Sequence, residues 1–373
     1  MDKCHDGLPM IQMTKKREST LVGLQIEAGS VAAAEVRTNG APKLTATAIA
    51  SLPPEVFHDG EVADGDALAE ALRSLFTEHK LSRRVRLGIA NQWVVVRNLR
   101  LPAIDDPKEL EAAVRFQAQE QIPMPVDQAV LDHRVVGAVA GAEGAAPQID
   151  VVVVAARREM IEASIKPLRD AGLRPVGVDL SAFGLIRAFG GSEVGEPPSG
   201  EGTEPGEAAA PAILYCHVGA VTNLAVARQR ACLFTRVSPV GLENVTADLA
   251  ASSNLPREDA GAWLHHVGLE QPTEAIEGDA EMVVKTRKAM EGGASSLLDE
   301  LRLSLDFYGA QEGSIPVERV VLCGPGSAIP GLAAHMEAAL GLPFANGRPE
   351  ALSGLDATSA ARLTLSYGLA LDL

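Results

Sequence analysis

Hydrophobic runs of strand length occur in two sets of three, one near the start of the chain and one after residue 211. The first set covers residues 21–26, 31–37 and 43–50, and the second covers residues 213–218, 222–227 and 231–238. Asn39-Gly40 between two of these runs indicates a hairpin. The pattern predicts an α/β fold in which one architecture is used twice, as two related lobes that face a cleft. Gln25 and His217 then occupy equivalent positions in the two copies.

A strand-helix-strand-strand-helix pattern follows the first copy. Its first helix is predicted to begin at Asp106-Pro107, an N-cap followed by an N1 proline, with Glu109 completing a capping box. Ile122-Pro123-Met124-Pro125 ends this helix, because neither proline can donate a backbone hydrogen bond. The strands are expected at residues 94–99, 129–136 and 149–155, and the second helix at residues 157–171, before Gly172. We interpret residues 92–172 as a small α+β subdomain inserted in the first lobe.

The second copy continues with helical segments between residues 243 and 312 and a buried-looking strand at residues 319–323. The glycine loop Gly324-Pro325-Gly326-Ser327 and a helix over residues 330–340 follow that strand. The expected boundaries are 20–91 and 173–192 for lobe 1, 212–240 and 295–373 for lobe 2, and 241–294 for a helical cap on lobe 2.

Two segments differ in composition from the rest. Residues 1–19 carry several charges, and residues 193–211 are dominated by Gly, Pro, Glu and Ala. We predict a disordered tail and a flexible linker there. The first twenty residues contain no apolar core of signal-peptide length, and no apolar run reaches the ~20 residues that cross a bilayer. We therefore expect a cytoplasmic protein that meets a membrane only through a partner.

Charge and cysteine spacing exclude further classes of function. A formal net charge of -16 disfavours unspecific attraction to nucleic acid or anionic lipid, since both are polyanions. The four cysteines, Cys4, Cys216, Cys232 and Cys323, lie too far apart for a metal or redox motif and are expected to be reduced thiols.

Several longer strings match one known family. The most specific are RFQAQEQIPMP at residues 115–125, with VLD at residues 130–132 behind it, and SLDFY at residues 304–308. Supporting strings are AGLRPVGVDL at residues 171–180, GPGS at residues 324–327 and YGLA at residues 367–370. From about residue 20 to its end, the chain resembles the family of the type IV pilus assembly protein PilM, which belongs with FtsA to the actin-like group.

The resemblance implies an actin-like fold of duplicated RNase H-like lobes, with a subdomain inserted in the first lobe and a helical cap on the second. Members of the family bind ATP and the short cytoplasmic N-terminal peptide of PilN, a single-span inner-membrane protein, near the junction of the inserted subdomain with the first lobe. Phe116, Ile122 and Met124 are candidates for this contact or, alternatively, for the subdomain core. We interpret Phe116 as a core residue and Met124 as a surface contact.

The resemblance also locates the two hairpins and the loop that would hold ATP and magnesium. In the first hairpin, Gln25 stands at the family's aspartate position and Glu27 at its glycine position, followed by Gly29 and Ser30. Glutamine supplies no anionic oxygen to magnesium, and Glu27 adds bulk and negative charge beside phosphate. A shifted loop through Gly29 and Ser30 would still offer backbone amides to an anion.

In the second hairpin, His217 stands at the aspartate position while Gly219 is kept. The adenosine-side loop with Gly324, Gly326 and Ser327 is intact, although such a turn also occurs as topology alone in α/β folds. Asp179 is a candidate support for a metal or, equally, a cap for a helix from Ser181.

Two classes of function remain open. One is a scaffold that binds the cytoplasmic peptide of a membrane protein, and the other is an ATPase that changes conformation with its bound nucleotide. Gln25, Glu27 and His217 favour the scaffold. A cytoplasmic part of a type II secretion protein shares the implied fold and is a third alternative. Self-association and further pilus proteins as partners stay open.

Overall fold

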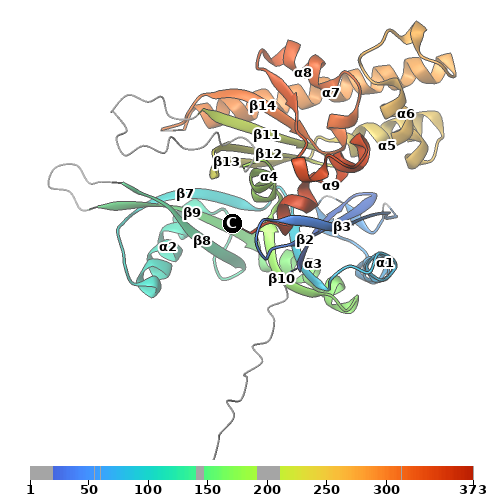
Figure 1. Ribbon diagram of the computed structural model, residues 1–373. Coiled ribbons are helices and arrows are strands. Elements are labelled where there is room, and N and C mark those ends of the chain that lie inside the picture. Colours follow the sequence, from blue (N-terminus) through green and yellow to red (C-terminus); the bar gives the residue numbers. More distant parts are fainter. Residues whose placement is uncertain are drawn as a thin grey trace, which may run out of the picture.

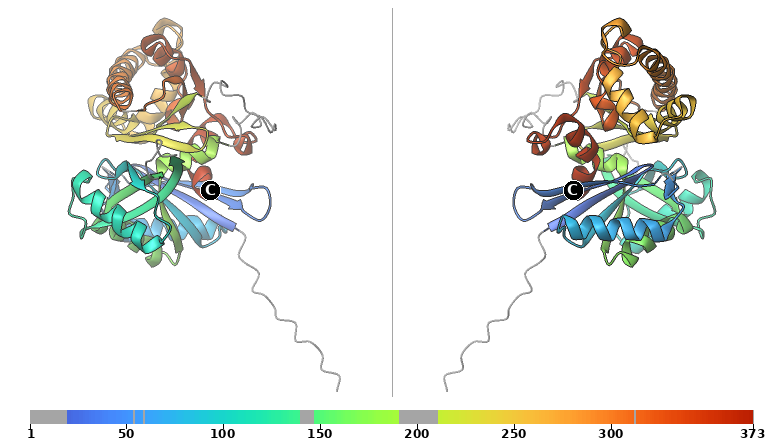
Figure 2. Two further views of the ribbon diagram at one scale, coloured as in Figure 1. Left: turned by 90° about the vertical axis from the view of Figure 1, so that its left-hand side faces the viewer. Right: turned by 90° about the vertical axis from the view of Figure 1, so that its right-hand side faces the viewer.

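The computed structural model of the chain describes residues 20–53, 55–58, 60–139, 147–190, 211–311 and 313–372. The predicted tail at residues 1–19 lies outside these ranges, as does the predicted linker at residues 193–211 except for Pro211. Figure 1 shows two lobes stacked on each other and a smaller subdomain beside the lower lobe. The side views in Figure 2 show the same stacking.

Lobe 1 is built on a five-stranded sheet with the strand order β10-β6-β1-β2-β3. β1, β2 and β3 form an antiparallel meander, whereas β6 and β10 run parallel to β1. The strands of the lobe are β1 (Thr20–Glu27), β2 (Ser30–Arg37), β3 (Lys43–Ser51), β6 (Arg84–Ile89) and β10 (Arg174–Leu180), with a short hairpin of β4 (Phe57–His58) and β5 (Glu61–Val62). Helix α1 (Gly65–Glu78) buries Leu68 and Leu72 in the core of this lobe.

Lobe 2 repeats this arrangement, since its sheet has the order β13-β12-β11-β14-β15. Its strands are β11 (Ala212–Val218), β12 (Thr222–Arg228), β13 (Ala231–Ser238), β14 (Val317–Cys323) and β15 (Phe344–Asn346). The first three again form an antiparallel meander, and β14 and β15 run parallel to β11. β1 and β11 therefore take the same central position in their sheets. The duplication predicted from the hydrophobic pattern is confirmed.

The hairpin expected at Asn39-Gly40 is present, but its connection is longer than these two residues. Arg37 pairs with Lys43, so residues 38–42 join β2 to β3. Gly40 has a φ of +90°, which glycine adopts without strain.

The inserted subdomain is a three-stranded antiparallel sheet with one helix packed on it. Its elements are β7 (Val95–Pro102), α2 (Pro107–Gln121), β8 (Ala129–Val139) and β9 (Gln148–Arg157), and the strand order is β7-β9-β8. Asp106 caps α2 as expected, because its side chain accepts hydrogen bonds from the backbone N–H groups of Lys108 and Glu109. Val114 and Ala118 of this helix pack on the sheet.

Helix α3 (Arg158–Asp170) belongs to lobe 1 rather than to the inserted subdomain. It packs against α1, and its Leu168 lies in the lobe 1 core with Leu173 and Leu72. The inserted subdomain therefore ends near Arg157, earlier than the expected boundary at residue 172.

The cap of lobe 2 shares one hydrophobic core with the sheet below it. Apart from its last helix, lobe 2 and its cap contain the helical elements α5 (Leu242–Ser253), α6 (Arg257–Val267), η1 (Thr273–Ala275), α7 (Ala280–Gly309), η2 (Pro325–Ala328), α8 (Leu332–Leu340) and η3 (Glu350–Leu352). Helix α7 runs without a break across the expected cap boundary at residue 294, and its Leu301 packs in one cluster with Leu214 of β11 and Leu322 of β14. Gly341 ends α8 with a φ of +75°, as predicted.

Two helices lie between the sheets and join the lobes (Figure 1). α4 (Ser181–Phe189) follows β10 of lobe 1 and packs on β12, whereas α9 (Ala357–Ala370) ends lobe 2 and packs on β1 and β2. The two helices approach closely, since a Cβ on Gly368 would lie 1.9 Å from the carbonyl oxygen of Gly184. Arg187 Nε donates to the Gly368 carbonyl at 3.0 Å and so binds the last turn of α9.

Candidate functional site

The two predicted hairpins meet in the cleft between the lobes. The first hairpin turns at Ala28-Gly29 between β1 and β2, and the second turns at residues 219–221 between β11 and β12. The glycine loop after β14 lies beside the second hairpin, because a Cβ on Gly326 would lie 2.7 Å from the Val218 side chain. The fold thus brings together the three segments that the sequence singled out.

Glu27 is the last residue of β1, and it crosses the cleft to the second hairpin. Its Oε2 accepts a hydrogen bond from the backbone N–H of Ala220 at 3.3 Å. Both carboxylate oxygens lie 2.7 Å from the place that a Cβ on Gly219 would take. The Glu27 side chain is only 12% exposed. Its carboxylate therefore fills the gap that the absent side chain of Gly219 leaves between the hairpins.

Gln25 lies next to this carboxylate and is buried. Its Nε2 donates a hydrogen bond to Glu27 Oε1, while its own Oε1 has no hydrogen-bond partner among the described residues. The first hairpin thus presents a neutral amide at the predicted aspartate position. The amide orients the Glu27 side chain.

His217 is fully buried at the corresponding position of the second lobe. Its Nδ1 lies 4.0 Å from Glu27 Oε1, and a Cβ on Gly324 would lie 2.7 Å from its Cδ2. Neither ring nitrogen has a hydrogen-bond partner within the described part of the chain. Burial lowers the pKa of His217 and outweighs the nearby Glu27, which raises it. The imidazole is therefore neutral at neutral pH.

The glycine loop is a short 3-10 turn closed by hydrogen bonds between its own residues. Gly324 has a φ of +76°, and its carbonyl accepts hydrogen bonds from both the backbone N–H and the hydroxyl of Ser327, at 2.9 and 2.8 Å. Gly326 is buried against β11. The Ser327 hydroxyl is thus engaged within the loop.

Gly29 and Ser30 form the other side of the first hairpin. Gly29 has a φ of +80°, and its carbonyl accepts a hydrogen bond from Leu52 N–H at 2.9 Å. Ser30 begins β2 and pairs with Glu27 across the turn. The turn is therefore short and tied to the end of β3.

Asp179 forms an ion pair with Arg187 instead of facing an open site. Its Oδ2 accepts a charge-assisted hydrogen bond from Arg187 Nη2 at 2.5 Å, and its Oδ1 accepts one from the backbone N–H of Leu180. Helix α4 has Leu180 at its N-cap and no side-chain cap. The alternative role expected for Asp179, a cap for this helix, is therefore wrong, and metal support by Asp179 would require the ion pair to open.

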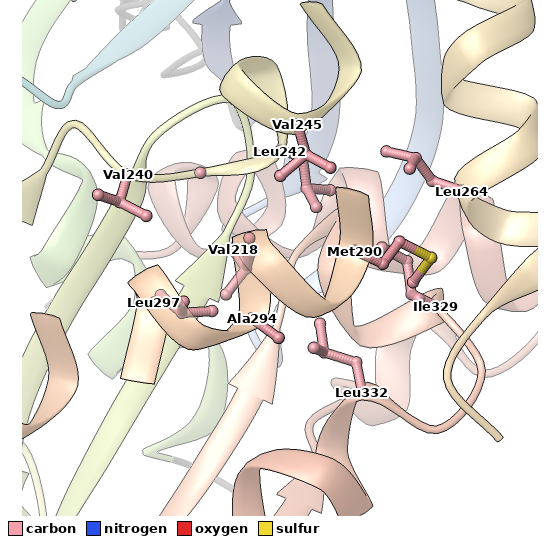
Figure 3. A pocket seen from close by; sticks show the side chains of 12 residues that line it. Val218, Val240, Leu242, Val245, Leu264, Met290, Ala294, Leu297, Ile329 and Leu332 are labelled. Carbon is pink, nitrogen blue, oxygen red and sulfur yellow. The ribbon is translucent and has the colours of Figure 1, made fainter. Parts of the chain in front are cut away.

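A small cavity on the cap side of the glycine loop is lined only by apolar side chains and glycines (Figure 3). Its volume is about 30 Å³. Val218 lines it from β11, Ile329 from the end of the glycine loop, Leu332 from α8, and Val245 and Met290 from the cap helices. A space of this size corresponds to about one water molecule.

A larger hollow of about 510 Å³ opens between the two hairpins, and Glu27 and Ala220 both line it. Residues from several elements line it, among them Glu55, Glu243 and Arg257, and Arg257 forms an ion pair with Glu243. Glu55, Glu243 and Arg257 belong to no motif along the chain, so sequence reasoning did not single out these three residues.

The three partner candidates on the inserted subdomain lie in different environments. Phe116 is 66% exposed, so its interpretation as a core residue is wrong. The reason is helical geometry: Val114 and Ala118 face the sheet, and a residue two positions from each points away from it. Ile122 is buried in the subdomain core. Met124 is half-buried and lines a surface hollow of about 350 Å³ with residues of α2 and with Val126 and Asp127.

The described cysteines are free thiols, and burial raises the pKa of Cys216 and of Cys232 to about 12.

Within the described ranges, no helix has both the length and the apolar character needed to cross a membrane. No group of three or more His, Cys, Asp or Glu side chains in the same ranges is placed to hold a metal ion.

Two lobes with one sheet order, facing each other across paired hairpins, define an actin-like fold. Solved structures with this fold support the assignment. The ethanolamine utilization protein EutJ from Carboxydothermus hydrogenoformans is 14% identical with a TM-score of 0.51, covering 94% of this chain and 89% of that chain. MreB5 of Spiroplasma citri bound to ADP is 12% identical with a TM-score of 0.53, covering 94% of this chain and 95% of that one.

The family is more specific than the fold. The model of the family "Type IV pilus assembly protein PilM" matches residues 23–349, and the chain belongs to this family. A solved structure of the PilM-PilN type IV pilus biogenesis complex is 27% identical with a TM-score of 0.75, covering 94% of this chain and 97% of that chain. A role in type IV pilus assembly follows from this membership.

Proposed function

We propose that this chain is a cytoplasmic scaffold of type IV pilus assembly that holds the N-terminal peptide of a PilN-like inner-membrane protein without a nucleotide cycle. The observation that carries the proposal is the Glu27 carboxylate between the two hairpins, where an actin-like site would hold phosphate. The likeness to the PilM-PilN complex supports a PilN-like partner. Such a partner would keep the chain at the inner membrane.

The cleft residues do not fit a magnesium-bound phosphate chain. Glu27 places a negative charge beside the hairpin amides, and a phosphate there would be repelled at close range. Magnesium prefers anionic oxygens, but Gln25 offers an amide and His217 a buried neutral imidazole. ATP and magnesium remain the ligands implied by the fold class, and these residues weigh against both.

The space next to the glycine loop does not fit a purine either. The cavity there has a volume of about 30 Å³ and apolar walls, so it offers neither room for an adenine ring nor side-chain partners for the ring nitrogens. The alternative function, a nucleotide-switched ATPase, would require the cap helices to move apart. The ADP-bound MreB5 structure shares only the fold at 12% identity.

We infer that the peptide docks on the inserted subdomain, where an exposed aromatic side chain stands near a hollow. Phe116 supplies a large apolar surface, and Met124 with Arg115 and Asp127 lines the hollow. Aromatic and methionine side chains with a polar rim are typical of peptide-binding surfaces. Ile122 supports this surface from the core beneath.

The test is calorimetric titration with a synthetic N-terminal peptide of a PilN-like inner-membrane protein from the same organism. We expect Phe116→Ser to weaken peptide binding by roughly tenfold or more, which corresponds to losing an interface anchor of about 1–2 kcal/mol. Because Phe116 is mostly exposed, the thermal unfolding of the variant should match that of the wild type within a few degrees.

Val284→Ser on α7 is the matched control. Val284 is 57% exposed and belongs to a different subdomain, so its replacement should leave peptide binding unchanged. Equal peptide affinity for wild type and Phe116→Ser would contradict the proposed docking surface. No binding by the folded wild type at high micromolar peptide would contradict the scaffold itself.

A further inference from the structure

Hairpin 2, defined here as residues 218–222, is built as an anion cradle. The N–H of Gly219 is engaged with the Val221 carbonyl at 3.1 Å, and the Gly219 carbonyl accepts from Leu242 N–H at the start of α5 at 2.8 Å. These bonds fix the turn and leave the N–H of Ala220 directed at the cleft, where it binds Glu27. A fixed turn with an outward amide and no side chain at Gly219 suits a small oxyanion.

The oxyanion in this cradle belongs to the chain itself. Glu27 Oε1 accepts from the Gln25 amide of its own lobe, and Oε2 accepts from Ala220 of the other lobe. A carboxylate that is 12% exposed needs such partners, because burial without hydrogen bonds is costly. Each carboxylate oxygen is thus bound by one lobe, so the side chain links the two lobes across the cleft.

We propose that Glu27 is a built-in ligand of an oxyanion site, which excludes phosphate groups and takes over their role of linking the two lobes. This inference rests on the proposed absence of a nucleotide cycle and adds a positive role for the residue. The geometry requires that a phosphate and the Glu27 carboxylate compete for one place beside Gly219 and Ala220. Removing the carboxylate should therefore create a site for phosphate-class oxyanions.

Inorganic pyrophosphate is the probe, titrated calorimetrically into the full chain without magnesium. We expect weak or no binding by the wild type and a gain of roughly tenfold or more in affinity for Glu27→Gly, because the variant loses both the competing group and its charge. Glu27→Asp keeps the charge on a shorter side chain and should gain little. Glu27→Gln keeps the shape without the charge and should fall between these two variants, and it serves if the glycine variant fails to fold.

Hydrogen exchange at the Ala220 amide provides a second readout that involves no ligand affinity. Exchange should be slow in the wild type, where Ala220 N–H donates to Glu27. It should be faster in Glu27→Asp, because the shorter carboxylate does not reach Ala220. In Glu27→Gly it should be fast without a ligand and slow when pyrophosphate is added. Equal exchange in wild type and Glu27→Asp would overturn the inference. Pyrophosphate binding as tight in the wild type as in Glu27→Gly or Glu27→Gln would overturn it as well. Peptide binding by the unaltered chain is a separate experiment, so its failure would reject the scaffold without deciding the role of Glu27.

Discussion

His217 is fully buried, and burial keeps its pKa below the ordinary value. The unfolded chain takes up a proton near the usual histidine pKa of about 6.5, whereas the folded chain resists protonation. The folded state therefore loses stability as the pH falls below this value, by at most about 1.4 kcal/mol per pH unit for one histidine. We expect His217→Asn to lose less stability than the wild type between about pH 7 and pH 5. Urea unfolding at a series of pH values measures this difference.

His265 is the control for this prediction. Burial lowers its pKa too and outweighs the backbone of Ala328, which raises it, and the residue lies on α6 rather than in either hairpin. His265→Asn should remove its own share of the pH dependence and leave that of His217 in place. Identical pH profiles for the wild type and His217→Asn would mean that His217 is protonated as easily in the folded chain as in the unfolded one.

The sequence located the cleft residues better than it described their contacts. Gln25 and His217 could be placed because each occupies the same position in a repeated strand pattern. The bond from Glu27 to Ala220 could not be predicted, since it depends on the distance between two lobes that are far apart in sequence. The exposure of Phe116 follows from the helical face that α2 buries, which its weak amphipathic pattern does not reveal.

Helix α7 offers an element-scale test in two adjacent glycines. A Cβ on Gly292 would meet no atom within 4 Å, whereas one on Gly293 would lie 2.4 Å from a methyl group of Val245 on α5. We expect Gly292→Ala to raise the free energy of unfolding by about 0.5–1 kcal/mol, because alanine favours the helix. Gly293→Ala should lack this gain or lower stability by about 1–3 kcal/mol, since the methyl group overpacks the contact between the helices. Urea unfolding of both variants measures the difference, and equal stabilisation by both would contradict the close packing of α5 on α7.

At the scale of single elements, the ends of helices could be predicted better than the elements against which the helices pack. Asp106 and Gly341 act through local hydrogen bonding and backbone conformation, which the sequence states directly. The assignment of α3 to lobe 1 depends on which neighbour its apolar side meets, and Leu168 alone does not specify α1. The same limit explains why the expected cap boundary at residue 294 falls inside α7. The buried residues of this helix continue from the cap onto the sheet, and the sequence does not show which neighbour each of them meets.

At the scale of the whole molecule, the lobes are joined by the α4–α9 crossing and by Glu27 across the cleft. The repeated sheet order could be predicted because each lobe carries its own strand pattern. The small apolar cavity beside the glycine loop could not be predicted, because Val245, Met290 and Ile329, which line it, come from separate elements of lobe 2. The crossing and the Glu27 contact are thus two links between the lobes that the chain makes with its own residues.

The proposed scaffold binds its partner peptide without nucleotide. Its direct test is calorimetric titration of the purified chain with the N-terminal peptide of the PilN-like protein, once with ATP and magnesium and once with EDTA. We predict the same peptide affinity in both conditions and no heat of binding from ATP and magnesium alone. Peptide binding that appears only with ATP, or tight ATP binding with turnover, would contradict a scaffold without a nucleotide cycle and would require the Glu27 carboxylate to leave the cradle.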